Sequence, residues 1–157
     1  PWIPEDMASA SIGQSVVQIT PLQLARAYSV FANGGWLVTP HLADQGLDWT
    51  DPARRTKVEM KPSTLNKIRE GLRKVVSDGT GYGLNGPGIP PAGGKTGTAE
   101  DSTGGPDHAW FATYAPYPEG KIVIVAFAQN TPGGGSVHAL PMAKKVMEVW
   151  NRTRGQQ

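Results

Sequence analysis

The sequence contains no cysteine, which excludes disulfides, thiol catalysis and zinc–thiolate sites together. It also lacks any run of about 18 apolar residues, the length that a membrane-spanning helix needs. Neither sign of charge dominates: 15 Lys and Arg stand against 13 Asp and Glu, and the formal net charge of +2 is too small to indicate a nucleic-acid partner. The absence of cysteine is compatible with a reducing compartment and also with an exported protein, so it does not decide between the two.

Glycine and proline, by contrast, are abundant, with 20 and 14 among 157 residues. They gather between segments that have a regular apolar period, which is typical of turns and not of disorder. The length fits one domain or part of one. The chain begins with Pro1-Trp2-Ile3-Pro4 and not with methionine. We therefore expect it to be a piece of a longer protein.

Apolar spacing predicts helices at about 20–33, 62–78 and 137–152. The first has a clear start, because Thr20 and Gln23 form a capping box and Pro21 suits the first helical position. Ser136 is expected to cap the last helix. Residues 1–19 show no firm period and are predicted to be extended or loop.

Strands are predicted at 36–39 and 56–60, at about 93–100, and as a pair within 108–128. The run 121–128 is continuously apolar, which is typical of a strand in the middle of a sheet with both faces covered. Turn residues at 116–120 predict a hairpin and therefore antiparallel neighbours. Together these segments indicate an α+β fold, an antiparallel β-sheet covered by helices.

One stretch, Ala92 to Glu100, has a composition suited to chemistry: Lys95 lies among glycines and the hydroxyls of Thr96 and Thr98. Glycine lets a ligand approach the backbone closely. The simplest interpretation is a surface turn. A phosphate loop is disfavoured, because Gly88 precedes the Gly-Lys-Thr triplet by one residue too many and no helix can open in the polar stretch that follows.

The third interpretation is that Lys95-Thr96-Gly97 resembles the Lys-Thr-Gly motif of the penicillin-recognising serine enzymes. Segments on both sides extend the resemblance to class B penicillin-binding proteins, in particular the elongation-type D,D-transpeptidases that cross-link peptidoglycan. These segments are Ser11-Ile12-Gly13-Gln14, Ile19 to Ala25, Asn33-Gly34-Gly35, Gly79-Thr80-Gly81, His108-Ala109-Trp110-Phe111 and Tyr114-Ala115-Pro116. The resemblance covers nearly all of residues 1–157 and implies the C-terminal portion of a transpeptidase domain, with a partial serine β-lactamase-like fold.

In that family a serine attacks the carbonyl of a D-Ala-D-Ala stem peptide, and β-lactams bind at the same site. The resemblance implies catalytic roles for Lys95, in proton transfer, and for Thr98, whose backbone N–H would bind the oxyanion. It also implies that the hydroxyls of Thr96 and Thr98 bind the substrate carboxylate and that Gly97 keeps the strand open to it. No cofactor or metal is implied.

The family's Ser-x-x-Lys and Ser-x-Asn motifs are absent from the sequence; Thr64-Leu65-Asn66-Lys67 is the nearest approach. We therefore expect the chain to be inactive alone. The resemblance places the parent protein on the outer (periplasmic) face of the bacterial cytoplasmic membrane, anchored by sequence outside this chain. The alternative is a non-catalytic module, derived from such a domain, that binds peptidoglycan or a partner.

The family sheet contains further strands from N-terminal sequence that this chain does not include. The apolar strand at 121–128 would then lack a neighbour, and we expect self-association or copurification with the missing N-terminal half.

Other polar residues receive no chemical role. The three histidines, His108 among them, lack the spacing of metal ligands and are expected at turn or surface positions. Asp107 and Glu100 are expected to be solvated carboxylates, with a place at the rim of the cleft as the alternative for both. Trp110 and Phe111 are expected to form core and cleft wall.

Overall fold

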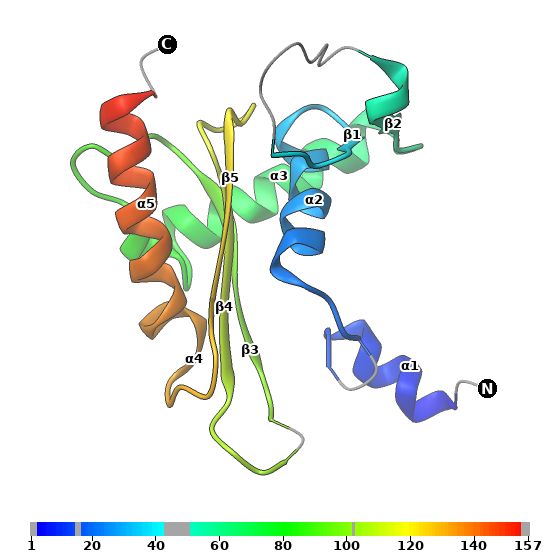
Figure 1. Ribbon diagram of the computed structural model, residues 1–157, viewed down its shortest axis with the longest axis vertical. Coiled ribbons are helices and arrows are strands. Elements are labelled where there is room, and N and C mark those ends of the chain that lie inside the picture. Colours follow the sequence, from blue (N-terminus) through cyan, green and yellow to red (C-terminus); the bar gives the residue numbers. More distant parts are fainter. Residues whose placement is uncertain (1–2, 15–16, 43–50, 102, 155–157) are drawn as a thin grey trace.

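The computed structural model describes residues 3–14, 17–42, 51–101 and 103–154 (Figure 1). Its helices are α1 (Pro4–Ser11), α2 (Pro21–Ala32), α3 (Pro62–Ser77), α4 (Gly134–Val137) and α5 (Ala139–Thr153), with short 3₁₀ turns at Pro52–Arg54 and Tyr82–Leu84. Its strands are β1 (Trp36–Val38), β2 (Arg55–Lys57), β3 (Gly93–Ala99), β4 (His108–Ala115) and β5 (Ile122–Ala128). No helix among these is long and apolar enough to cross a membrane.

The main sheet is antiparallel, in the order β3-β4-β5, and β1 pairs with β2 in a separate ribbon. The predicted hairpin between β4 and β5 is confirmed, with Tyr114 opposite Val123. Helix α5 lies on one face of the sheet and α2 on the other, so the prediction that both faces of β5 are covered is also confirmed (Figure 1). Within the described residues, however, β5 lies at the sheet edge, and the central strand is β4.

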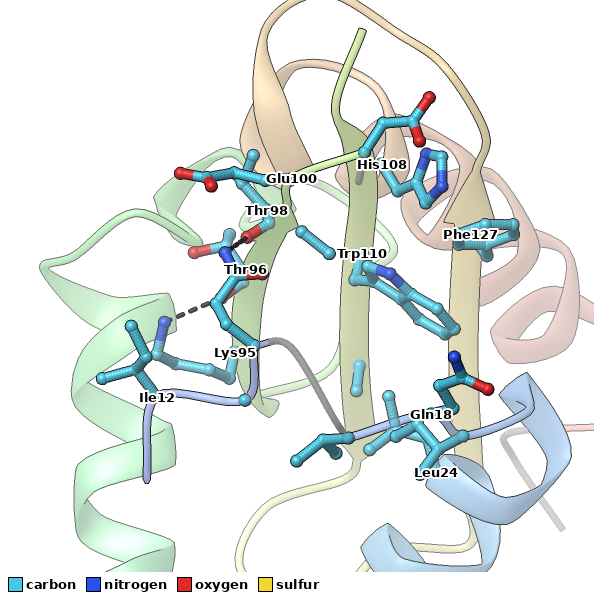
Figure 2. A pocket seen from close by; sticks show the side chains of 18 of the residues that line it. Ile12, Gln18, Leu24, Lys95, Thr96, Thr98, Glu100, His108, Trp110 and Phe127 are labelled. Atoms are coloured by element: carbon cyan, nitrogen blue, oxygen red, sulfur yellow. Dashed lines mark hydrogen bonds between the residues drawn. The ribbon is translucent and has the colours of Figure 1, made fainter. Parts of the chain in front are cut away.

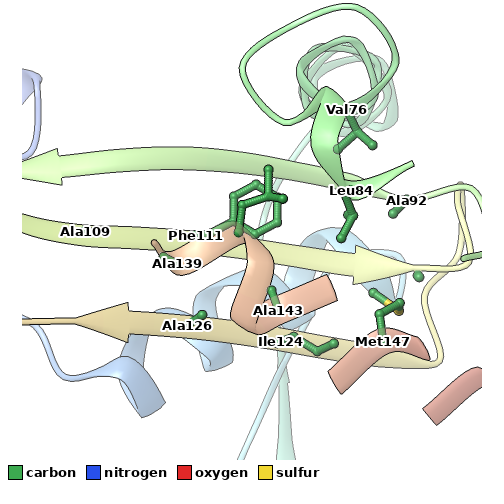
Figure 3. Close-up of a cluster of buried hydrophobic side chains, with 12 residues drawn as sticks. Val76, Leu84, Ala92, Ala109, Phe111, Ile124, Ala126, Ala139, Ala143 and Met147 are labelled. Carbon is green, nitrogen blue, oxygen red and sulfur yellow. The ribbon is translucent and has the colours of Figure 1, made fainter. Parts of the chain in front are cut away.

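The sheet separates two apolar clusters, because successive side chains of a strand point to opposite faces. On the α5 face, Phe111 and Met147 are completely buried members of the larger cluster (Figure 3). On the α2 face, Tyr28 packs near Tyr114. Burial raises the pKa of Tyr28 and that of Tyr114 to about 12. Both hydroxyls therefore remain neutral at physiological pH.

Helix α2 begins at the predicted capping box. The backbone N–H of Gln23 donates to Thr20 Oγ1 at 3.2 Å, and the N–H of Thr20 donates to Gln23 Oε1 at 2.7 Å. At the other end, Arg69 of α3 donates from Nε to the carbonyl oxygen of Phe31 at 2.7 Å. Both ends of α2 are therefore held by specific hydrogen bonds, which fix the helix that covers this face of the sheet.

The prediction of loop over residues 1–19 is wrong for part of that stretch, because Pro4–Ser11 forms α1; residues 1–2 and 15–16 lie outside the described residues. Pro4 occupies the first turn of α1, where a missing N–H costs nothing. Asp6 accepts a hydrogen bond from the backbone N–H of Ile3. The helix buries no residue, so it lacks the apolar period by which helices are found in a sequence.

The predicted cap at Ser136 is also wrong. Ser136 lies inside the short helix α4, and α5 starts after His138 without any side-chain cap. Gly133 has a left-handed backbone, with φ of 106°, and this starts the chain into α4 earlier than the apolar period indicates.

Replacing Thr20 with Ala is expected to lower the free energy of unfolding by about 1 kcal/mol, because it leaves the N–H of Gln23 without its cap. Chemical denaturation measures the change. Thr20→Ser is the control, since it retains the hydroxyl. Equal stabilities for the two variants would contradict a capping role.

Candidate functional site: the edge of strand β3

The lysine stretch forms β3, which pairs only with β4 among the described strands. Lys95 lies opposite Ala112 and Gly97 opposite Trp110. Because side chains alternate along a strand, Lys95 and Gly97 share the α2 face, whereas Thr96 and Thr98 share the other. The four residues that the sequence singles out therefore lie together in one strand but divide between its two faces.

The backbone groups of two of these residues point away from β4. The carbonyl oxygen of Thr96 accepts from Lys95 Nζ at 2.7 Å, and that of Thr98 accepts from Gln14 Nε2 at 3.4 Å. In an antiparallel ladder a residue exchanges both of its backbone bonds with the opposite residue or neither. The N–H of Thr98 therefore also faces the outer edge of β3, where it can meet a ligand.

A cavity of about 650 Å³ lies against this strand on the α2 face (Figure 2). Trp110 and Phe127 form an aromatic wall, with their ring centroids 4.3 Å apart. Leu24 and Ile12 add apolar surface, and Lys95 contributes positive charge. The volume and mixed lining are those of a site for a small molecule or a peptide end.

Acidic and imidazole groups line the end of the cavity near the β3–β4 turn, where Glu100, Asp101 and His108 contribute. The backbone N–H and the hydroxyl of Thr103 donate to Asp101 at 2.9 and 2.8 Å, and these bonds lower the pKa of its carboxyl group. The N–H of Asn130 donates to His108 Nδ1 at 3.2 Å, so in the neutral ring the proton sits on Nε2. Over the described ranges, no three His, Asp or Glu side chains form a group that could hold a metal ion.

Trp110 and Phe111 were expected to form core and cleft wall, and the structure has one residue in each place. Trp110 lies on the wall of the cavity, whereas the side chain of Phe111 is 0% exposed in the core. Asp107 does not line the cavity; its carbonyl oxygen accepts from the N–H of Thr131 at 2.8 Å.

No role was predicted for Thr80, which lies in the Gly79-Thr80-Gly81 segment of the family resemblance. The structure places Thr80 Oγ1 2.7 Å from Thr96 Oγ1, within hydrogen-bonding distance. The signal available in the sequence was a hydroxyl between two glycines directly after a helix. Its contact partner depends on tertiary structure.

The back of β3 is supported by the backbone of α4. A Cβ atom at Gly135 would lie 2.7 Å from the carbonyl oxygen and 3.0 Å from the nitrogen of Gly97. At Gly134, whose φ is +60°, a Cβ would lie 2.5 Å from Thr98 Oγ1. Only glycine allows this approach. From the sequence, the run Gly133-Gly134-Gly135 was predicted only to lead into the last helix.

The chain is similar in sequence to proteins of one known family. Residues 1–148 match the family described as penicillin binding protein transpeptidase domain. The chain is 34% identical to the Peptidoglycan D,D-transpeptidase MrdA of Haemophilus influenzae, over 98% of this chain and 27% of that protein.

Several solved structures are similar over nearly the whole chain. One is Pseudomonas aeruginosa PBP2 in complex with WCK 5153, with a TM-score of 0.81 and 32% identity over 95% of this chain and 34% of the other. Another is PBP2 of Helicobacter pylori in a complex with MreC, with a TM-score of 0.80 and 25% identity over 97% and 28%. The chain spans about a quarter of the length of the curated relatives it matches.

Gly135→Ala is expected to destabilise the chain by about 1–3 kcal/mol, because the added methyl group must push β3 and β4 away from α4. Thermal denaturation measures the loss, and amide chemical shifts of Gly97 and Thr98 report the displacement. Gly71→Ala is the control, since no atom lies within 4 Å of its Cβ position in α3, and alanine there favours the helix. A Gly135→Ala chain with unchanged stability and shifts would show that α4 does not support β3.

Proposed function

This chain belongs to the penicillin-binding protein transpeptidase family, and we propose that it supplies the substrate and oxyanion strand of a serine-type peptidoglycan D,D-transpeptidase. The observation that carries the proposal is the orientation of Thr98. Its carbonyl oxygen accepts from Gln14 Nε2 at 3.4 Å, which places that oxygen at the outer edge of β3, and the N–H of the same residue points to the same edge. Acyl transfer requires a fixed donor of this kind beside the reacting carbonyl.

The proposed reaction has two stages. A serine supplied by sequence outside this chain attacks the carbonyl of a D-Ala-D-Ala stem peptide, and terminal D-alanine leaves. An amine of a second stem peptide then takes the acyl group and releases the serine. In each tetrahedral intermediate the N–H of Thr98 donates to the oxygen that carries the negative charge. This bond is strongest when that charge develops, which is how it lowers the barrier.

The charged and hydroxyl groups of β3 suit the substrate's carboxylate end. Lys95 places a positive charge at the cavity wall, where it attracts a carboxylate and assists proton transfer. Thr96 and Thr98 line the same cavity, and their hydroxyls can donate to the two carboxylate oxygens. Gly97 between them carries no side chain that would obstruct the ligand. β-Lactams, which also carry an acyl group and a carboxylate, are proposed to bind in the same way.

Two further parts of the proposal concern the whole protein. The sequence holds neither Ser-x-x-Lys nor Ser-x-Asn, so we propose that the isolated chain forms no acyl-enzyme. The parent protein is proposed to act on the outer face of the cytoplasmic membrane, where peptidoglycan is assembled. The same absence of motifs favours a second candidate, a non-catalytic module that binds peptidoglycan or a partner. If the parent gene encodes both Ser-x-x-Lys and Ser-x-Asn upstream of Pro1, this would support the transpeptidase function.

A fluorescent penicillin is expected to label the whole parent protein at a serine upstream of this chain and to leave the isolated 157-residue chain unlabelled. In the parent, Lys95→Ala is expected to reduce the labelling rate by about 100-fold or more. Lys121→Ala, a lysine outside the cavity lining, is the control. Gel fluorescence and mass spectrometry measure the adduct. Covalent labelling of the isolated chain would contradict the proposal that the nucleophile lies outside it. An unlabelled parent protein would contradict the proposed transpeptidase activity.

The outer edge of β5 is expected to pair with another polypeptide, since β5 pairs only with β4 among the described strands and is rich in β-branched residues. The isolated chain should dimerise, exchange segments or copurify with the N-terminal half of its domain. Light scattering over a dilution series measures this association. A stable, monodisperse monomer at high concentration would contradict it.

A further inference from the structure

Beside the proposed carboxylate-binding strand lies a hydroxyl that comes from a different part of the chain. Thr80 Oγ1 is 2.7 Å from Thr96 Oγ1, although the two residues are 16 positions apart in the sequence. Thr80 is exposed and Thr96 is half-buried. The pair therefore lies where a ligand can reach it, and its hydrogen bond is not a contact of the core.

A rigid turn holds Thr80 in this place. The N–H groups of Gly79 and Gly81 both donate to the carbonyl oxygen of Val75, at 3.2 and 2.9 Å, and so wrap the chain around the end of α3. Side chains would crowd this turn, because a Cβ at Gly79 would lie 3.0 Å from Val75 O and one at Gly81 would lie 3.1 Å from it. The glycines thus let the turn close tightly, which fixes the backbone that carries the Thr80 hydroxyl.

Hydroxyl chemistry then limits how the pair can act. Each hydroxyl has one hydrogen to donate and two lone pairs that accept. Thr96 can donate its hydrogen to a carboxylate and still keep the bond to Thr80 only if Thr80 is the donor between them. In that arrangement the two bonds run in one direction, from Thr80 to Thr96 to the carboxylate, and each strengthens the other.

We propose that Thr80 is a positioning residue for the substrate carboxylate: its hydroxyl donates to Thr96 Oγ1 and thereby directs the Thr96 hydrogen at the ligand. The inference rests on the proposed function, because it requires a ligand carboxylate in the cavity within reach of the Thr96 hydroxyl. It adds a residue of the Gly79-Thr80-Gly81 turn to the binding site. It also gives that turn a chemical role beyond ending α3.

The test is the acylation rate of the whole transpeptidase that contains this chain, measured with benzylpenicillin and with its methyl ester, which lacks the carboxylate. Thr80→Val keeps the shape of the side chain and removes the hydroxyl. It should slow acylation by benzylpenicillin by about two- to tenfold, the effect of one hydrogen bond, and leave the ester rate unchanged. Thr80→Ser should restore the rate with benzylpenicillin. Thr64→Val, the same replacement at an exposed position near the start of α3, is the matched control.

Thr96→Val separates failure of this inference from failure of the proposed function. A slow Thr96→Val enzyme together with a Thr80→Val enzyme at the wild-type rate would overturn the role of Thr80 and leave the proposed function intact. Equal slowing of both probes by Thr80→Val would also overturn it, since that pattern indicates a general effect on the fold. A wild-type protein that neither probe acylates would refute the proposed function and this inference with it.

Discussion

The site depends on the antiparallel pairing of β3 with β4, which among the described strands occupies one edge of β3. Pairing of Gly97 with Trp110 sets the register, and the backbone of α4 packs directly behind this pair at Gly135. The opposite edge of β3 keeps the N–H of Thr98 available. A strand that is hydrogen-bonded along one edge can hold an N–H group of its other edge in a fixed position. That N–H makes no bond within the sheet and remains able to donate to a ligand. Such preorganisation is what electrostatic stabilisation of an oxyanion requires.

The helices on either side contribute differently to this strand. On the α5 face, buried aliphatic side chains and Met147 pack in one cluster with Phe111 and hold β4 in place. On the α2 face, the sheet and the segment around Ile12 enclose a cavity instead of a complete core. The end of α3 adds a third element, because its terminal turn brings Thr80 to Thr96. Parts of the chain that precede and follow β3 in the sequence thus converge on a few of its residues.

Much of this arrangement could be predicted before the structure. The capping box at Thr20 located α2, and the turn residues between the apolar stretches indicated the β4–β5 hairpin. The Lys95-Thr96-Gly97 motif indicated the family to which the chain belongs. Local signals suffice in these cases, because a cap, a tight turn and a short motif each act through neighbours within a few residues. Helix α1 was missed because it buries no residue and so leaves no apolar period to detect.

Local signals in the sequence are therefore enough to predict the elements with local causes, the chemical groups of β3 and the family resemblance that those groups carry. The packing of distant segments sets three further features: which edge of β3 is unpaired among the described strands, the support of that strand by Gly135, and the contact of Thr80 with Thr96. The physical reason is that these contacts join residues far apart in the chain. Backbone direction and close approach between such segments depend on how sheet and helices pack, and spacing along the sequence carries no record of that packing.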